Sequence, residues 1–209
     1  MRASGHDPIR GEYTRAATHY DRRWADYIER STRETLARLS SNAADQVLDI
    51  GCGTGVLLER LSRTVDPRQL TGVDLTPAML AVARRRLPAG VALSAARAEA
   101  LPFNEDSFDV VISCNVFHFI DDPTAGLREM HRVLRPGGRV VITDWCRDYR
   151  SCRVVERWLR LTGRAHHRVH GSRELSELLA ESGFAELAQD RYRIDWWWGS
   201  MTLTGRKTS

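Results

Sequence analysis

Apolar residues along the chain form short, dense runs that alternate with stretches of helical spacing. The dense runs predict β-strands at residues 46–50, 70–75, 90–96, 107–116 and 139–145. In the fourth run the apolar residues follow one another instead of alternating with polar ones, which indicates a strand buried on both faces. Strands that alternate with helices are typical of an α/β fold with a mostly parallel sheet.

The stretches between and after these strands carry helix signals. Helices are predicted at residues 57–64, 77–87, 125–134 and 172–184. Pro77 suits a first helical turn, and the sequence "RPGG" at 135–138 ends the third helix. The fourth helix is expected to begin after Ser172 as its N-cap and to stop at Gly183.

Two further segments flank this core. Residues 12–40 are predicted as helix, and we expect them to act as a lid or cap. Their aromatic residues lie near helical spacing: Tyr13, Tyr20, Trp24 and Tyr27. After the fifth strand the chain is polar and arginine-rich, and residues 191–207 alternate around Gly199 as in a β-hairpin.

The composition is that of a mildly basic globular domain. The 31 Lys and Arg residues are answered by 27 Asp and Glu, with a net charge of +4 and a pI of about 9.1, so we do not expect a nucleic-acid partner. The four cysteines form neither a C-x-x-C pair nor a disulfide framework. No 18-residue apolar stretch and no signal peptide is present, so we expect a cytoplasmic protein. We further expect a monomer or a homodimer.

The sequence "VLDIGCGTG" at residues 47–55 places a glycine-rich loop after the first strand, where α/β sheets bind ligands. Side chains at Gly51, Gly53 and Gly55 would keep a ligand away from the backbone. The spacing G-x-G-x-G differs from the dinucleotide fingerprint G-x-G-x-x-G, which disfavours a nicotinamide enzyme. Asp49 would repel a pyrophosphate but would attract an ammonium or sulfonium group.

A second carboxylate, Asp74, ends the next strand about 20 residues after the glycine loop. At that place a carboxylate accepts hydrogen bonds from the two ribose hydroxyls of a nucleoside. The two acids together predict a ligand in which a nucleoside is joined to an amino acid.

Four segments in this order resemble successive motifs of the class I S-adenosylmethionine-dependent methyltransferases. They are "VLDIGCGTG", "GVDLTPAMLAVAR", "AEALPFNEDSFDVVIS" and "EMHRVLRPGGRVVITD". The nearest type is that of the ubiquinone and menaquinone biosynthesis C-methyltransferases, and the resemblance covers about residues 45–145. It implies a doubly wound, mostly parallel seven-stranded sheet with an antiparallel C-terminal hairpin strand.

The resemblance also implies one domain over residues 1–209 and a set of residues that bind S-adenosylmethionine. Residues 1–44 would form the lid, 45–145 the cofactor core, and 146–209 the substrate side with the terminal hairpin. The implied contacts are Asp49, Gly51, Cys52, Gly53, Gly55 and Asn115 for the methionine part, Asp74 for the ribose, Leu75, Ala98 and Glu99 for the adenine, and Tyr20 as the closing side chain. Family members usually carry an acid where this chain has Arg97, which cannot accept the hydrogen bond of the adenine amino group.

Methyl transfer from a sulfonium needs mainly alignment and exclusion of water, so a strict catalytic residue is not required. A base is needed only if the acceptor arrives protonated. His118, which we expect to open onto the crevice, and Asp144 are the candidates; each could instead serve the local structure. His166, His167 and His170 lack a carboxylate or cysteine that would complete a metal site, so no metal is predicted.

Two aromatic groups have alternative interpretations. Tyr20 and Trp24 lie about one helical turn apart, and they either close over the cofactor or pack as an ordinary amphipathic helix. Trp196, Trp197 and Trp198 would alternate faces in a strand, with two of them completing the core or forming a wall for an apolar acceptor.

The sequence thus predicts a methyltransferase acting on a small-molecule acceptor. Methylation of RNA or protein, and a catalytically silent partner subunit that retains the cofactor fold, remain as alternatives. The identity of the acceptor atom is not indicated.

Overall fold

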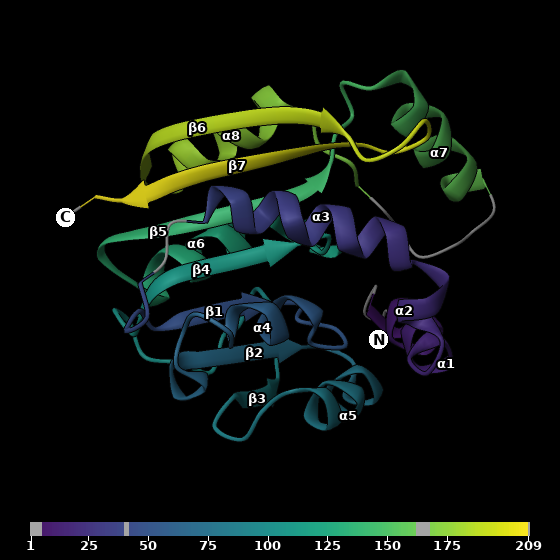
Figure 1. Ribbon diagram of the computed structural model, residues 1–209. Helices are drawn as coiled ribbons and strands as arrows, with labels where there is room; N and C mark the ends of the chain where they lie inside the picture. Colours follow the sequence, from purple (N-terminus) through teal and green to yellow (C-terminus); the bar gives the residue numbers. More distant parts are fainter. Residues whose placement is uncertain (1–5, 40–41, 162–167, 209) are drawn as a thin grey trace, which may run out of the picture.

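A seven-stranded sheet with helices on both faces forms the body of the protein (Figure 1). The computed structural model describes residues 6–39, 42–161 and 168–208. The strands are β1 (Val47–Ile50), β2 (Leu70–Asp74), β3 (Ala92–Ala95), β4 (Phe108–Cys114), β5 (Leu134–Trp145), β6 (Phe184–Arg193) and β7 (Gly199–Lys207). The helices are α1 (His6–Ala16), α2 (Tyr20–Arg23), α3 (Ala25–Arg38), α4 (Val56–Leu61), α5 (Pro77–Arg86), α6 (Pro123–Val133), α7 (Arg150–Leu161) and α8 (Ser172–Glu181), with short 3₁₀ helices η1 (Pro67–Gln69) and η2 (Phe117–Phe119).

The strand order is β3-β2-β1-β4-β5-β7-β6. Strands β1 to β5 are parallel, whereas β7 runs antiparallel to both β5 and β6. The predicted doubly wound sheet with an antiparallel C-terminal hairpin strand is therefore confirmed. The reversal of strand order between β1 and β4 opens a crevice at the carboxyl ends of these strands.

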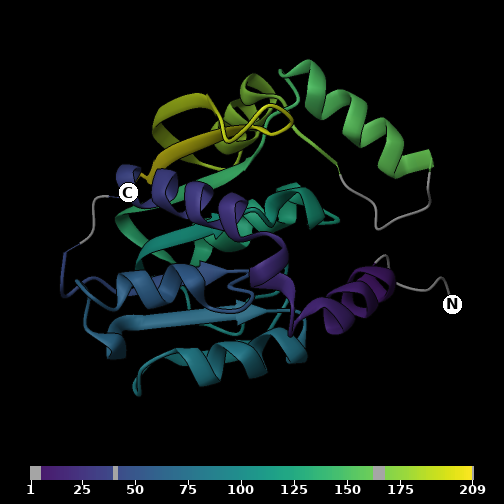
Figure 2. The same cartoon turned by 45° about the vertical axis from the view of Figure 1, so that its right-hand side comes forward.

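The two faces of the sheet carry separate apolar clusters. Helices α3 and α4 cover one face, and α6 and α8 cover the other (Figures 1 and 2). The strand β4 serves both clusters, since Val111 packs with the α6 side and Val110 and Ile112 with the α4 side. This explains why its apolar residues follow one another in the sequence.

The N-terminal segment differs from the predicted single helix. It forms three helices, because the chain leaves helical geometry after Ala16 and again at Trp24, whose φ and ψ are −116° and 22°. The first break allows α1 to fold back, so that the rings of Tyr13 and Tyr20 meet at 5.7 Å between centroids. Tertiary contact of these rings outweighs the helical periodicity of the segment.

Three predictions after residue 133 are corrected. The third helix ends at Val133, just before residues 135–138 as predicted, but strand β5 begins already at Leu134, and residues 135–138 bulge from its pairing with β4. The arginine-rich stretch contains the helix α7, which carries no recognisable cap in the sequence. Gly171, not Ser172, is the N-cap of α8, because the Ser172 hydroxyl is engaged by Asp148 at 2.6 Å.

The tryptophans near the predicted hairpin lie in its turn and not in a strand. They therefore do not alternate between faces. Trp196 and Trp197 are 80% and 60% exposed, and only Trp198 packs inward, 4.4 Å from the ring of Trp145. Gly183 does end α8 as predicted, with a φ of 93°.

Candidate functional site

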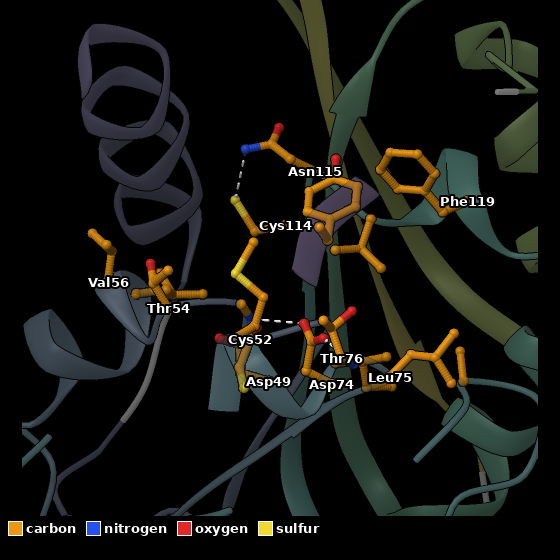
Figure 3. A pocket seen from close by; sticks show the side chains of 18 of the residues that line it. Asp49, Cys52, Thr54, Val56, Asp74, Leu75, Thr76, Cys114, Asn115 and Phe119 are labelled. Carbon is orange, nitrogen blue, oxygen red and sulfur yellow. Dashed lines mark hydrogen bonds between the residues drawn. The ribbon is translucent and has the colours of Figure 1, made fainter. Parts of the chain in front are cut away.

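A cavity lies at the carboxyl ends of β1, β2 and β4, beneath α1 and α2. Its wall includes ten of the predicted residues: Tyr20, Asp49, Gly51, Cys52, Gly53, Asp74, Leu75, Ala98, Glu99 and Asn115. Figure 3 shows Asp49 and Asp74 at one end of the cavity, with Asn115 and Phe119 at the other. Gly55, His118 and Asp144 are not part of the wall.

The three glycines of the loop have different functions. A Cβ at Gly51 would collide with Val116 at 2.3 Å, and one at Gly55 would lie 3.1 Å from Leu87 of the α5 region. Only at Gly53 is the space open, since a Cβ there would have the Gly51 carbonyl oxygen, 3.9 Å away, as its nearest neighbour. At Gly51 and Gly55 the missing side chain is thus required by packing within the protein, whereas at Gly53 the open space is available to a ligand.

Asp49 is buried in the cavity wall, with 2% of its surface exposed. Among the described residues, none donates a hydrogen bond to its carboxyl group. Burial, and next the charge of Asp74, raise the pKa of Asp49 well above its usual value of 3.8. A buried carboxyl group that faces a cavity without a donor is suited to receive one from a ligand.

Asp74 lies at the end of β2, and neighbouring residues already donate hydrogen bonds to its carboxylate. Its Oδ2 accepts a hydrogen bond from the Gly53 amide at 2.9 Å, and its Oδ1 accepts one from the Thr76 amide at 2.7 Å. The Thr76 side chain also bonds this carboxylate. A carboxylate has about four acceptor positions, so one remains for a ligand hydroxyl group. Asp74 also ties the glycine loop to β2.

Aromatic side chains that the sequence analysis did not assign to the site close the cavity. The ring of Tyr13 from α1 meets Phe119 of η2 edge to face, with 5.5 Å between centroids. Both rings belong to the cavity wall, as does Tyr20. Burial raises the pKa of Tyr13 and of Tyr20, so both phenols stay protonated at neutral pH.

Polar contacts fasten helix α2 to the glycine loop. Helices α1 and α2 are called the lid below, after the role predicted for the N-terminal segment. The Thr54 hydroxyl donates to Asp21 Oδ1 at 2.6 Å, and Arg86 of α5 donates to the Thr54 carbonyl at 2.7 Å. Arg86 also forms an ion pair with Asp21. We call Asp21, Thr54 and Arg86 the lid latch.

Trp24 does not follow Tyr20 into the cavity wall. It lies at the junction of α2 and α3 and packs against Tyr27 and Trp198, with ring centroids 6.3 Å and 6.4 Å away. Of the two aromatic residues expected to close over the cofactor, the structure places Tyr20 in the wall and Trp24 in a neighbouring aromatic cluster.

His118 does not line the cavity and is buried, with 4% of its surface exposed, so the prediction that it opens onto the crevice is wrong. A 2.6 Å hydrogen bond joins His118 Nδ1 to Asp144 Oδ1, and the His118 amide donates to Asp144 Oδ2 at 2.8 Å. Its imidazole stacks on Trp145 and contacts Phe119, with 4.5 Å and 4.0 Å between ring centroids. Phe119, which lines the cavity, therefore lies between the cavity and the His118–Asp144 pair.

Arg97 stands where the family usually has an acid, and it forms ion pairs with two neighbouring acids. Its guanidinium lies 3.4 Å from Glu99 Oε1 and 3.8 Å from Asp121 Oδ2. The Glu99 carboxylate also accepts the Asp121 amide at 3.2 Å. Glu99 thus supplies a carboxylate to the wall two positions after Arg97, where the family usually has its acid.

Of the three histidines considered as metal ligands, the structure describes only His170. His166 and His167 lie outside the described residues. His170 is buried beside Phe117, and burial lowers its pKa. Within residues 6–39, 42–161 and 168–208, no three His, Cys, Asp or Glu side chains stand close enough to hold a metal ion.

Comparison with known proteins agrees with this geometry. A family model described as a methyltransferase domain matches residues 48–142. Over 191 residues the chain is 31% identical to the malonyl-[acyl-carrier protein] O-methyltransferase of Marinomonas sp. (strain MWYL1), with 90% of this chain and 70% of that protein covered. The chain belongs to the class I methyltransferase family.

Other members of this methyltransferase family show the same relationship. The O-methyltransferase resE of Aspergillus sclerotiorum is 36% identical over 169 residues, a match that covers 76% of this chain but only 62% of that protein. A solved chain from the complex between the methyltransferase activator Trm112 of Haloferax volcanii and a methyltransferase superposes with a TM-score of 0.82 at 23% identity, covering 95% of this chain and 98% of that one. At this identity the superposition shows the shared fold of the methyltransferase family.

Each helix in the described part of this family member is too short or too polar to cross a membrane.

Proposed function

We propose that this protein transfers the methyl group of S-adenosylmethionine to a small-molecule acceptor. The observation that carries the proposal is the buried Asp49 carboxyl group. It faces the cavity beside the open position at Gly53, and no residue that the structure describes donates a hydrogen bond to it. An amino acid's ammonium group supplies the missing donor. Family membership supports the same conclusion.

The wall residues fit the parts of this cofactor. Asp49 would receive the ammonium group, Gly53 would let the ligand approach the backbone, and the Asp74 carboxylate would accept a hydrogen bond from the ribose hydroxyls. Leu75, Ala98 and Glu99 would contact the adenine. When bound, the cofactor supplies an electrophilic methyl group on a sulfonium, while Tyr13, Tyr20 and Phe119 exclude water from the cavity.

His118, held by Asp144, is our candidate base for an acceptor that arrives protonated. The role requires the acceptor to reach the imidazole past Phe119. We expect His118→Gln to lower turnover roughly a hundredfold, the lower end for loss of a general base, while the affinity for S-adenosylhomocysteine stays unchanged. Unaltered turnover would show that the pair only supports the η2 turn, as would a loss confined to thermal stability.

Calorimetry with S-adenosylhomocysteine and with NADH tests the cofactor. We expect the first to bind and the second not to bind, and we expect Asp74→Ala to abolish binding because the ribose contacts and the anchor of Gly53 are lost together. Binding of NADH alone would contradict the proposal.

Labelled S-adenosylmethionine incubated with metabolite extracts then tests the acceptor. Label in a small organic product supports the proposal, whereas label in RNA or protein favours the alternative methyltransferases. Cofactor binding without any labelled product would favour the silent partner subunit. Because both relatives named above methylate oxygen, phenols and carboxylic acids are the first acceptors to examine.

A further inference from the structure

The carboxamide of Asn115 is held at both ends by one helix. Asn115 follows β4 with a φ of 61° and lies in the cavity wall. Its Oδ1 accepts a hydrogen bond from the Tyr27 hydroxyl at 2.7 Å, and its Nδ2 donates to Ser31 Oγ at 2.8 Å. Tyr27 and Ser31 are one turn apart on α3, so the helix grips both atoms of the amide.

The directions of the hydrogen bonds that join Trp145, Tyr27, Asn115 and Ser31 are determined. Asn115 Nδ2 has a further contact with Cys114 Sγ at 3.6 Å. Trp145 Nε1 can only donate, and it donates to the Tyr27 hydroxyl at 2.6 Å. The single proton of Tyr27 is therefore left for Asn115 Oδ1. Ser31 uses its own proton on a main-chain carbonyl, that of Tyr27 at 2.8 Å or of Ile28 at 3.3 Å, and so accepts from Asn115.

The surroundings keep Tyr27 in this state. Removal of the phenol from water, and next the charge of Asp144, raise its pKa well above 10, so the donated proton stays in place. The ring of Trp198 packs 6.0 Å from the Tyr27 ring and 4.4 Å from that of Trp145. Trp145 of β5 and Trp198 of the hairpin turn thus hold the Tyr27 side chain in place.

We propose that Tyr27 is a positioning residue of the cofactor site, which acts by fixing the carboxamide of Asn115. The assignment rests on the proposed function. One lone pair of Asn115 Oδ1 is taken by Tyr27, and the second remains for an N–H donor in the cavity. The carboxamide of Asn115 would therefore border the amino-acid part of the ligand, and it favours a group that donates an N–H over a group that only accepts hydrogen bonds.

The test compares two ligands that differ only in the amino-acid part. S-adenosylhomocysteine has this part, whereas 5′-methylthioadenosine lacks it. We expect Tyr27→Phe to weaken binding of S-adenosylhomocysteine roughly fivefold or more, as for loss of one hydrogen bond to a polar group, and to leave binding of methylthioadenosine within about twofold. Tyr192→Phe is the matched control, because its hydroxyl bonds to Thr202 at 2.7 Å away from the cavity wall.

A second pair of variants keeps the test decisive if Tyr27→Phe folds poorly. Ser31→Ala breaks the same group from the other end and is expected to discriminate between the two ligands in the same way. In an Asn115→Ala background Tyr27→Phe should cost nothing further, since it acts through Asn115. Equal weakening of both ligands, or of neither, would overturn the assignment, whereas failure of the unmodified protein to bind S-adenosylhomocysteine would overturn the proposed function instead.

Discussion

The carboxyl group of Asp49 is placed where its charge is unfavourable in the free protein and favourable once a cation is bound. Its raised pKa means that folding favours the protonated form, so its contribution to stability is complete below pH 3.8 and is lost as the pH rises through the raised value. A ligand ammonium favours the ionised form. Affinity for such a ligand should therefore increase with pH over the same range, while the stability of the free protein decreases.

Asp49→Asn should separate the two effects. The free variant should melt at a higher temperature than the unmodified protein near neutral pH, because no charge is buried. Its affinity for S-adenosylhomocysteine should fall about tenfold or more, the usual effect of removing a hydrogen bond to a charged group, and should lose the pH dependence. Thermal melts and calorimetry at several pH values measure both quantities.

Asp26→Asn is the matched control, since Asp26 is an exposed carboxylate of α3 outside the cavity wall. It should change neither the melting temperature nor the affinity. If Asp49→Asn destabilised the free protein, the carboxyl group would have a donor that the described contacts lack.

Individual residues differ in how far the sequence reveals them. Asp49 and Asp74 are predictable because the carboxyl ends of parallel strands converge, and each acid lies at that end of its strand. Tyr27 is not, since its helical spacing is equally that of a packed face, and its hydroxyl meets Asn115 across 88 positions of sequence. The burial of His118 likewise depends on Trp145 and Asp144 from another strand.

At the scale of elements, the lid latch joins the lid to α5 through one arginine. Arg86 bonds Thr54 and Asp21 and also reaches Glu59 at 3.2 Å. Because Tyr20 adjoins Asp21 and lies in the cavity wall, opening of the latch should precede exit of a ligand.

Arg86→Met removes the donors and retains the apolar stem. We expect S-adenosylhomocysteine to dissociate roughly fivefold faster, which corresponds to about 1 kcal/mol for contacts that are partly exposed to water. Stopped-flow tryptophan fluorescence measures the rate. Arg85→Met is the control, because Arg85 is exposed on the same helix and has no ion pair in the described structure; an equal acceleration in both variants would assign the effect to α5 rather than to the latch.

At the scale of the whole molecule, some elements are determined by their own stretch of sequence, and others depend on contacts with distant residues. The five parallel strands and their helices could be predicted, since each is set by its own run of apolar residues. The breaks in the N-terminal helix could not, because they depend on Tyr13 meeting Tyr20 and Phe119. The sequence does not indicate helix α7, because its arginines resemble those of a solvated loop. Its buried side depends on contacts with distant residues, such as that of Cys152 with Gly199, 3.2 Å from sulfur to carbonyl oxygen.

Strand β7 follows β6 in the chain yet lies between β5 and β6. When the ribosome has synthesised the chain as far as Trp145, one edge of β5 is therefore still unpaired. Ser200, the partner of Trp145, follows 55 positions later. Until then the unpaired edge can pair with another extended peptide. Synthesis of residues 199–207 is thus the step that ends the period of greatest risk of aggregation.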